Sequence, residues 1–361
     1  MSKSIHLPGL NGLRAIAALS VLWGHLFQGI FGEWNVAGGG WTLPAVYDGV
    51  TLFFVISGFL ITYLLLNEQR KSQTVSIGKF YMRRILRIWP IYFLYLVIAL
   101  TVTGSWHEEG LWYYLVFTAN IPFIMSVGIL PIAHYWSISV EEQYYLFWPW
   151  LVRLTRGRGR RLLWLALGLC CGWLAMKYGL YLTCGTTLVY RFFAATRFDC
   201  MMLGVMGAIL FYHRQPLFMR VLGNRWLGLV CLLAVGFSVP WAGYVPAPLR
   251  PQVLALLSLG AIMGQVVGHP VINLENRIMD SIGKVSYGIY VIHPLMIYLL
   301  SALWRSWNPD LPGAISNILI YCGVTLAAYA VAWVSYQYFE RPFLKLKNSF
   351  AVVQSSSSMK D

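Results

Sequence analysis

Long uncharged runs of apolar residues recur along this chain, separated by short segments that carry most of its charge. An α-helix rises 1.5 Å per residue, so about 20 residues cross a hydrocarbon core of about 30 Å. The pattern therefore predicts an all-α fold, a polytopic membrane bundle in which helices cross the bilayer repeatedly. Representative runs are Val50–Leu66, Ile88–Trp106, Trp226–Leu249, Pro251–Val267 and Val285–Trp304.

The positions of Lys and Arg favour about ten crossings with both termini in the cytoplasm. The predicted spans are 10–31, 50–66, 88–106, 135–152, 162–180, 192–212, 226–243, 251–268, 285–304 and 313–336. This arrangement places 21 of the 27 basic residues in inner segments, as expected when cytoplasmic loops carry the positive charge. The other six are Arg14, Lys177, Arg191, Arg197, Arg250 and Arg305.

Residues 111–133 are apolar for 23 residues and are long enough to form an eleventh span. Counting them as a span would place the basic segment 153–161 outside, against the positive-inside bias. Asn120, Pro122 and Pro131 also disfavour a regular helix here. We therefore expect a re-entrant or interfacial segment.

Composition agrees with a protein that is solvated by lipid. Of the 361 residues, 58% are hydrophobic and only 11% are charged, whereas soluble domains carry roughly 25% charged residues. The net charge of +14 is concentrated in connecting segments, so we expect no nucleic-acid partner. The six cysteines lack paired spacing, so no metal site is expected. One transmembrane domain is expected over 1–342, followed by a disordered cytoplasmic tail over 343–361.

Two ionisable residues interrupt the first span. Arg14 and His25 are 11 residues apart, close to three helical turns, so they share one face about 16 Å apart. Each has a simpler explanation, since Arg14 could snorkel to the interface and His25 could be a satisfied interior histidine. Together they indicate a line from an anion site near the cytoplasm to a deep proton acceptor.

Two adjacent carboxylates, Glu141 and Glu142, interrupt the segment WSISVEEQYYLFWPW. On a helix, Glu141 shares a face with Ser137 and Tyr145, while Glu142 points about 100° away. One of the pair is therefore expected to face the interior as a functional carboxylate. A charge favoured by the helix macrodipole would explain the pattern equally simply.

Arg84 and Arg87 lie three residues apart just before a predicted span, in KFYMRRILRIWPIY. Guanidinium groups match the oxygens of phosphate, so the pair predicts a phosphate site. Simple positive-inside anchoring would give the same pattern.

Other polar residues in or beside spans complete the candidate set. Asp48 precedes a span, and Arg197 and Asp199 in TRFD are two residues apart, so they need separate partners. Tyr290 and His293 lie in SYGIYVIHP, where His293 precedes a proline and is equally open to a role in a helix kink.

These segments, in this order, resemble the acyltransferase-3 family of integral membrane acyltransferases, which includes bacterial O-acetylases of surface sugars. LPGLNGLRAIAALSVLWGH, with Arg followed by ten residues and then His, is similar to the opening of the family. DGVTLFFVISGFLIT, RRILRIWPIY, WSISVEEQYYLFWP, TRFDCMMLG, SYGIYVIHP and YFERP are similar to later blocks, although many members have Gly where this chain has Cys200. Seven blocks in order, spanning Leu7 to about Pro342, make the resemblance specific.

The resemblance implies a membrane O-acyltransferase, with acetyl-CoA as the usual donor and a hydroxyl of an extracytoplasmic sugar or polysaccharide, such as lipopolysaccharide, as the acceptor. It implies that Arg84 and Arg87 bind the CoA phosphates and that Arg14 holds the donor further in. His25 would act as general base or briefly carry the acyl group, and Glu141 would orient its imidazole. It also implies a location in the bacterial cytoplasmic (inner) membrane and a reaction that uses no metal.

A glycan or anion transporter is the main alternative, because broken helices and buried charges serve transport equally well. Release of the CoA thiol separates the two functions. The sequence indicates neither the acceptor sugar, the acyl chain length, nor the oligomeric state.

Overall fold

The computed structural model describes residues 5–28, 46–237, 244–267, 269–307 and 313–353, and this part of the chain contains helices and no strand. The predicted all-α class is confirmed. The α-helices are α1 (Leu10–Gln28), α2 (Val46–Ser72), α3 (Ile77–Thr103), α4 (Leu111–Leu115), α5 (Asn120–Ile124), α6 (Tyr135–Leu154), α7 (Gly159–Cys184), α8 (Leu188–Thr196), α9 (Phe198–Tyr212), α10 (Pro216–Leu222), α11 (Arg225–Gly236), α13 (Arg250–Val266), α14 (Arg277–Lys284), α15 (Ser286–Trp307), α16 (Gly313–Ser335) and α17 (Arg341–Ser349).

The helices fit a multi-pass membrane protein. Six helical segments of the described chain are long and apolar enough to cross a membrane, and the bent pair α10 and α11 would make a seventh. A helix overlaps each of the ten predicted spans, but several of these, such as the 17-residue α13, are too short or too polar for that criterion. The count of ten crossings therefore stays a prediction.

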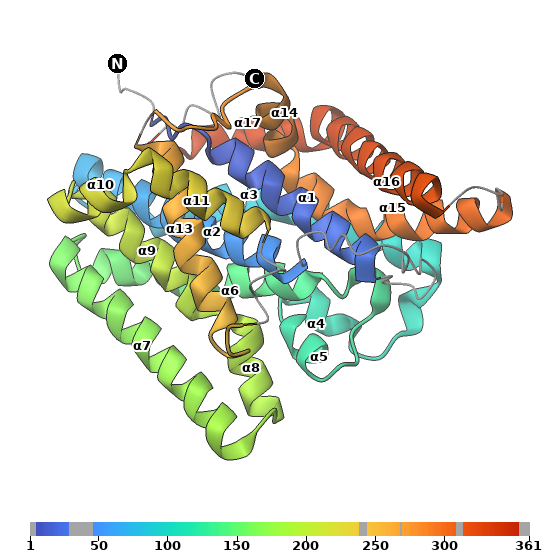
Figure 1. Ribbon diagram of the computed structural model, residues 1–361, viewed down its shortest axis with the longest axis horizontal. Coiled ribbons are helices and arrows are strands. Elements are labelled where there is room, and N and C mark those ends of the chain that lie inside the picture. The colour runs from blue at the N-terminus through green and yellow to red at the C-terminus, as the bar shows by residue number, and fades with distance from the viewer. Residues whose placement is uncertain (1–4, 29–45, 238–243, 268, 308–312, 354–361) are drawn as a thin grey trace.

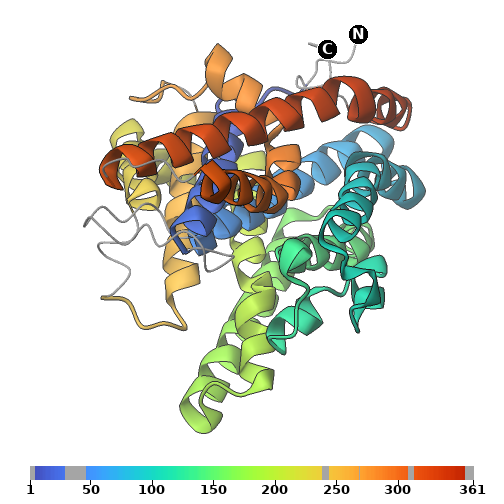
Figure 2. The ribbon, with the colours of Figure 1, turned by 90° about the vertical axis from the view of Figure 1, so that its right-hand side faces the viewer.

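Helix α1 lies inside the bundle, where it contacts α2, α13, α14 and α15 (Figure 1). Helices α7 and α16 lie toward opposite edges, and the turn from α7 into α8 projects from the rest of the molecule (Figure 2). Glycines let α2 and α9 approach closely, since a Cβ on Gly58 would overlap the Met201 carbonyl and one on Gly204 would overlap that of Val55. This close packing fixes the helix that carries Ser57 beside the candidate site.

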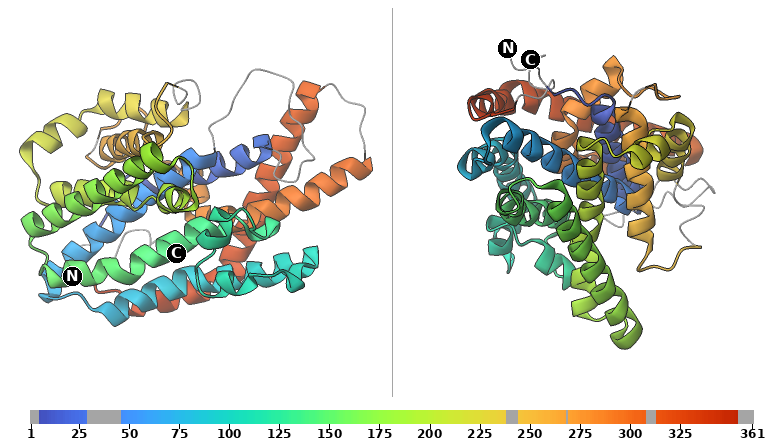
Figure 3. Two further views of the ribbon diagram at one scale, coloured as in Figure 1. Left: turned by 90° about the horizontal axis from the view of Figure 1, so that it is seen from below. Right: turned by 90° about the vertical axis from the view of Figure 1, so that its left-hand side faces the viewer.

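Many of the long helices run side by side along the length of the molecule (Figure 3), and contacts join several of their basic connecting segments. Gly157 packs against the Gln69 side chain, and the Arg70 guanidinium lies 6.0 Å from the centre of the Tyr212 ring. The Arg83 Nη1 donates to the Phe350 carbonyl at 2.9 Å. These contacts join the segments that were predicted to share one side of the membrane.

Residues 111–133 do not form one continuous helix. They contain α4, α5 and a 3₁₀ turn at Leu130–Ile132, and they pack against the second half of α3. The Tyr92 hydroxyl donates to the Tyr114 carbonyl at 2.7 Å, and the Tyr95 hydroxyl donates to the Pro131 carbonyl at 3.0 Å. The irregular backbone fits the prolines, while a re-entrant or interfacial position stays a prediction.

The tail differs from the sequence prediction over its first residues. Residues 343–349 belong to α17, which packs on α3, rather than to a disordered segment. A turn of π-helix, Tyr336–Glu340, joins α16 to α17, so the helix continues past the expected boundary. The four serines of the tail fall at 355–358, outside the described residues.

Candidate active site

Three arginines from two helices converge inside the bundle. Arg14 comes from α1, and Arg84 and Arg87 lie one turn apart on α3. All three line the same two adjoining cavities. In the described part of the chain, none of the three forms a hydrogen bond or a carboxylate ion pair, and the Arg84 Nε is buried without a partner. Unpaired cations that face a cavity are suited to bind an anion.

The larger of these cavities, called here the mouth cavity, has a volume of about 150 Å³. Lys284 and Lys347 join the three arginines in its lining. Of its three acidic residues, Glu68 is paired with Arg83 at 2.8 Å and Glu275 with His6 at 2.9 Å, while Asp280 accepts a hydrogen bond from Asn11 Nδ2 at 3.3 Å. The mouth cavity is therefore strongly cationic.

The smaller cavity, called here the inner pocket, has a volume of about 70 Å³ and shares all three arginines with the mouth cavity. Its polar floor is a hydrogen-bonded chain in which the Tyr145 hydroxyl donates to Ser57 Oγ at 3.3 Å. Ser57 donates in turn to Glu141 Oε1 at 2.5 Å. Ser137 and Tyr290 also line it. This space admits a small group beyond the arginines.

His25 lies against a second histidine. Its Nδ1 is 2.7 Å from His293 Nε2, and the two rings stack with centroids 4.9 Å apart and planes 13° from parallel. The His293 Nδ1 is 2.7 Å from the Tyr290 carbonyl oxygen. His293 is fully buried, while His25 is partly exposed. We call these two residues the histidine pair.

The predicted contact between Glu141 and His25 is wrong. Glu141 bonds to Ser57 and interacts electrostatically with the three arginines, whereas the partner of His25 is His293. Glu141 lies in the inner pocket with the three arginines, and α15 rather than α6 supplies the neighbour of His25. Which residues of two separate helices meet cannot be read from the spacing along either one.

Tyr290 connects the inner pocket with the histidine pair. Its hydroxyl bonds to Ser137 Oγ and donates to the His134 carbonyl at 3.1 Å. Its ring lines the inner pocket and lies 5.8 Å from the His293 ring. The lining of the inner pocket includes neither His25 nor His293. The Tyr290 side chain therefore separates the arginines from the histidine pair in this conformation.

Two buried residues at the site escaped the sequence analysis. His134 precedes α6, and its ring lies 5.3 Å from that of His293, with Nε2 3.1 Å from the Val291 carbonyl oxygen. Glu340, in the π-helical turn, lines a third cavity with Arg14 and Arg87. A carboxylate within the block YFERP was the available signal for Glu340, because a buried acid needs a cation nearby.

Two further candidates from the sequence, Glu142 and Asp48, are not seen to face the cavities. Glu142 faces away from the cavities and accepts a hydrogen bond from Trp89 Nε1 at 3.1 Å. Asp48 falls in the first turn of α2, but its side chain lies outside the described residues.

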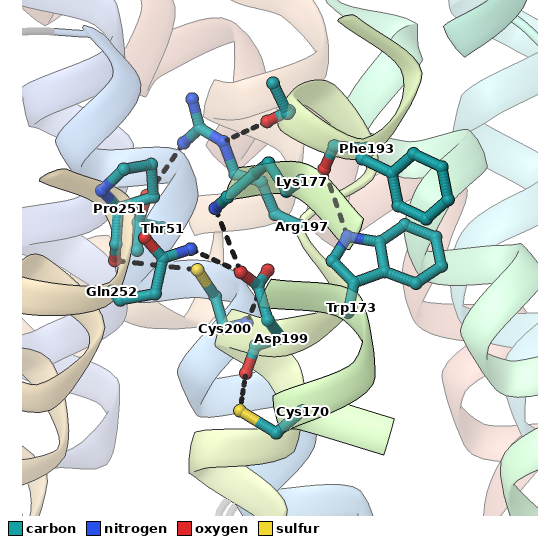
Figure 4. Close-up of polar contacts among 11 residues, drawn as sticks. Thr51, Cys170, Trp173, Lys177, Phe193, Arg197, Asp199, Cys200, Pro251 and Gln252 are labelled. Carbon is teal, nitrogen blue, oxygen red and sulfur yellow. Dashed lines mark hydrogen bonds and ion pairs between the residues drawn. The ribbon is translucent and has the colours of Figure 1, made fainter. Parts of the chain in front are cut away.

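Arg197 and Asp199 have separate partners, as their spacing predicted (Figure 4). Arg197 Nη1 donates to Thr51 Oγ1 at 2.8 Å. Asp199 Oδ2 pairs with Lys177 Nζ at 3.0 Å and also accepts from Gln252 Nε2. We call Lys177, Asp199 and Gln252 the anchor cluster; it links α7, α9 and α13 and does not line the mouth cavity or the inner pocket.

Comparison with known proteins gives a consistent family assignment. The model of the Acyl_transf_3 family, described as an acyltransferase domain, matches residues 7–337. The chain is 27% identical to the peptidoglycan O-acetyltransferase OatA of Listeria monocytogenes, over 94% of this chain and 56% of that protein. It is 25% identical to the O-acetyltransferase OatA of Staphylococcus aureus, over 94% of this chain and 57% of that protein. The chain thus spans just over half the length of these relatives. No solved structure matches it.

Proposed function

We propose that this chain, which belongs to the Acyl_transf_3 family of acyltransferases, is an O-acetyltransferase that uses acetyl-CoA as donor and a carbohydrate hydroxyl as acceptor. The observation that carries the proposal is a set of unpaired arginines lining a cavity that ends one side chain away from a stacked histidine pair. An enzyme that transfers a group from a phosphorylated donor needs such an arrangement, with an anion site and a proton acceptor in series.

The arginines are proposed to hold the donor. The mouth cavity would take the phosphates of CoA, with Arg84 and Arg87 as forked donors to phosphate oxygens and Arg14 bound deeper. The small inner pocket would admit the thioester end. Its volume of about 70 Å³ is sufficient for an acetyl group.

His25 is the proposed proton acceptor, since imidazole takes and returns protons near neutral pH. It removes the proton from the acceptor hydroxyl while the hydroxyl oxygen attacks the thioester carbonyl carbon. A C–O bond forms and the C–S bond breaks, with its electron pair leaving on sulfur. The CoA thiolate then takes the proton from the His25 imidazolium. In a second route, a His25 nitrogen attacks the thioester carbonyl carbon and the C–S bond breaks, which releases the CoA thiolate. The acceptor hydroxyl oxygen then attacks the acetyl-histidine, the C–N bond breaks, and the hydroxyl proton passes by way of His25 to the thiolate.

Glu141 is proposed to act in donor binding rather than on His25. Its carboxylate lies among three guanidinium groups, so it moderates their mutual repulsion when no donor is bound. Its hydrogen bond to Ser57 fixes that position on the floor of the inner pocket.

The proposed location is the bacterial cytoplasmic membrane, with the basic connecting segments and both termini in the cytoplasm. The donor would then enter from the cytoplasm, and the acceptor sugar would approach from the opposite side. The name of the Listeria relative makes peptidoglycan the first acceptor to test.

Membrane vesicles from bacteria that produce the protein provide the test, because they carry their own glycans as acceptors. Added acetyl-CoA should release CoA thiol, and mass spectrometry should find one more acetyl unit on the glycans than in vesicles without the gene. His25→Ala should abolish both signals. Glycan or anion flux without thiol release would instead indicate a transporter and end the proposal.

A further inference from the structure

Two successive contacts, from the Tyr290 carbonyl to His293 and from His293 to His25, determine which nitrogen of His25 is free to act as a base. The His293 Nδ1 is 2.7 Å from the Tyr290 carbonyl oxygen, and His293 Nε2 is 2.7 Å from His25 Nδ1. A carbonyl oxygen can only accept a hydrogen bond, so His293 Nδ1 carries a hydrogen. The remaining question is whether His293 Nε2 carries one as well.

The surroundings of His293 favour a neutral ring. His293 is fully buried, and its close neighbours are the rings of His25, His134 and Tyr290 and the backbone carbonyls of Tyr290 and Ile289. No carboxylate forms an ion pair with it among the described residues. A buried cation without a counter-charge is costly, so Nε2 keeps its lone pair and accepts a hydrogen bond from His25 Nδ1.

Pro294 explains why the Tyr290 carbonyl is available to His293. In an α-helix the N–H of residue 294 would donate to the carbonyl of residue 290, but proline has no N–H. The freed oxygen accepts from His293 Nδ1 instead. Pro294 thus acts on His293 without interrupting α15, because its missing N–H frees the acceptor that orients the histidine.

We propose that His293 is a positioning residue that holds His25 in the tautomer with hydrogen on Nδ1 and a free lone pair on Nε2. Its Nε2 occupies the place that a carboxylate oxygen has in a hydrolase triad, where the same tautomer is held by a charged acceptor. The proposal rests on the proposed function, because a free Nε2 matters only if His25 takes a proton or an acyl group.

Two substitutions with amide side chains each reproduce the position of one ring nitrogen of His293. In His293→Gln the side-chain oxygen reaches the position of Nε2 and can accept from His25. In His293→Asn the shorter amide reaches the position of Nδ1 and leaves His25 Nδ1 without a partner. A packing role would also favour Gln, which is nearer to His in size than Asn is. His293→Met, which is close to Gln in size but offers His25 Nδ1 no good acceptor, is therefore the matched control and should fail as His293→Asn does.

The experiment measures acetyl-CoA-dependent thiol release by vesicles that contain each full-length variant and carry their native glycans. We expect His293→Asn to lower kcat by about 10²-fold or more, the usual contribution of a general base, and His293→Gln to lower it by less than about tenfold. KM for acetyl-CoA should change little in either variant, since His293 does not line the mouth cavity.

A direct readout accompanies the kinetics. In protein labelled with ¹⁵N-histidine, the His25 signals, assigned by their loss in His25→Ala, should show a protonated Nδ1 and an unprotonated Nε2. A protonated Nε2, or equal kcat values for the Gln and Asn variants, would overturn the role of His293 while leaving the acetyltransferase assignment intact. An inactive wild-type protein would instead overturn the proposed function.

Discussion

The arginine site and the anchor cluster both place charges inside the bundle, but they differ in whether each charge has a partner. Lys177 and Asp199 pair at 3.0 Å, and only 1% and 0% of their side chains is exposed. Gln252 and the Cys200 N–H complete the hydrogen bonds of the Asp199 carboxylate. Arg14, Arg84 and Arg87 instead repel one another across an open cavity.

This difference separates stability from function. A buried charge that is fully bonded holds its helices together and leaves nothing over for a ligand. The three arginines form no ion pair among the described residues and share only the longer-range attraction of Glu141, so their repulsion costs stability in the free protein and a bound anion relieves it. Pairing, rather than depth in the membrane, therefore distinguishes a scaffold residue from a site residue here.

The largest expected effect is on the anchor cluster. Asp199→Leu leaves Lys177 charged and buried without a partner, so the free energy of unfolding should fall by about 3–5 kcal/mol. Unfolding of the purified protein in mild detergent measures it. The double variant Lys177→Met with Asp199→Leu should recover most of the loss, and a single variant as stable as wild type would show that the pair is not a scaffold element.

The arginine site should behave in the opposite way. Arg87→Gln should change the stability of the free protein little, because it removes repulsion from Arg14 and Arg84 together with attraction to Glu340. It should weaken acetyl-CoA binding by about 10–100-fold through one lost charged hydrogen bond. Calorimetric titration measures the affinity. Arg220→Gln, on exposed α10, is the matched control and should bind normally. An Arg87 variant with wild-type affinity would contradict the phosphate role.

A smaller effect sharpens the role of Glu141. Glu141→Gln keeps an acceptor for Ser57 but removes the charge that moderates the arginines, so the free protein should lose about 1 kcal/mol of stability. Acetyl-CoA should then raise its melting temperature by more than it raises that of wild type. Glu142→Gln, whose carboxylate accepts from Trp89 and acts on Arg84 alone among the three arginines, should change the acetyl-CoA-induced shift by less than Glu141→Gln does. Equal ligand-induced shifts in all three proteins would refute the moderating role.

The smallest effect is expected for Lys347, in the lining of the mouth cavity. Lys347→Ala should weaken acetyl-CoA binding only by about two- to fivefold at low salt, since rim charges are screened. The difference from wild type should vanish at high salt. Lys79→Ala, exposed and outside the lining, should show no difference at either salt concentration.

Patterns along single helices were readable from the sequence. Apolar runs located the helices, and the 11-residue spacing placed Arg14 and His25 on one face of α1. The partners of Arg197 and Asp199 were correctly expected to be separate. Lys177, noted as a basic residue left within a span, could also have been matched to Asp199, since a lysine in lipid needs an acid.

Relations between helices were not readable. The resemblance implied that Glu141 orients His25, whereas the packing of α15 against α1 brings His293 there. His134 lies between two predicted segments and gave no sign of being buried. Its ring nitrogen contacts the carbonyl of Val291 in α15, which is 157 residues further along the chain. Hydropathy gives the position of a span, but contact between spans follows from side-chain packing that one sequence does not display.

The central claim is that the unpaired arginines receive the phosphates of the donor and direct its thioester toward His25. A structure of the full chain with a non-hydrolysable acetyl-CoA analogue tests it most directly. We predict phosphate oxygens about 3 Å from guanidinium nitrogens of Arg84 or Arg87, with the thioester mimic in the inner pocket beyond Arg14. An analogue bound elsewhere, with the three guanidinium groups untouched, would contradict the account.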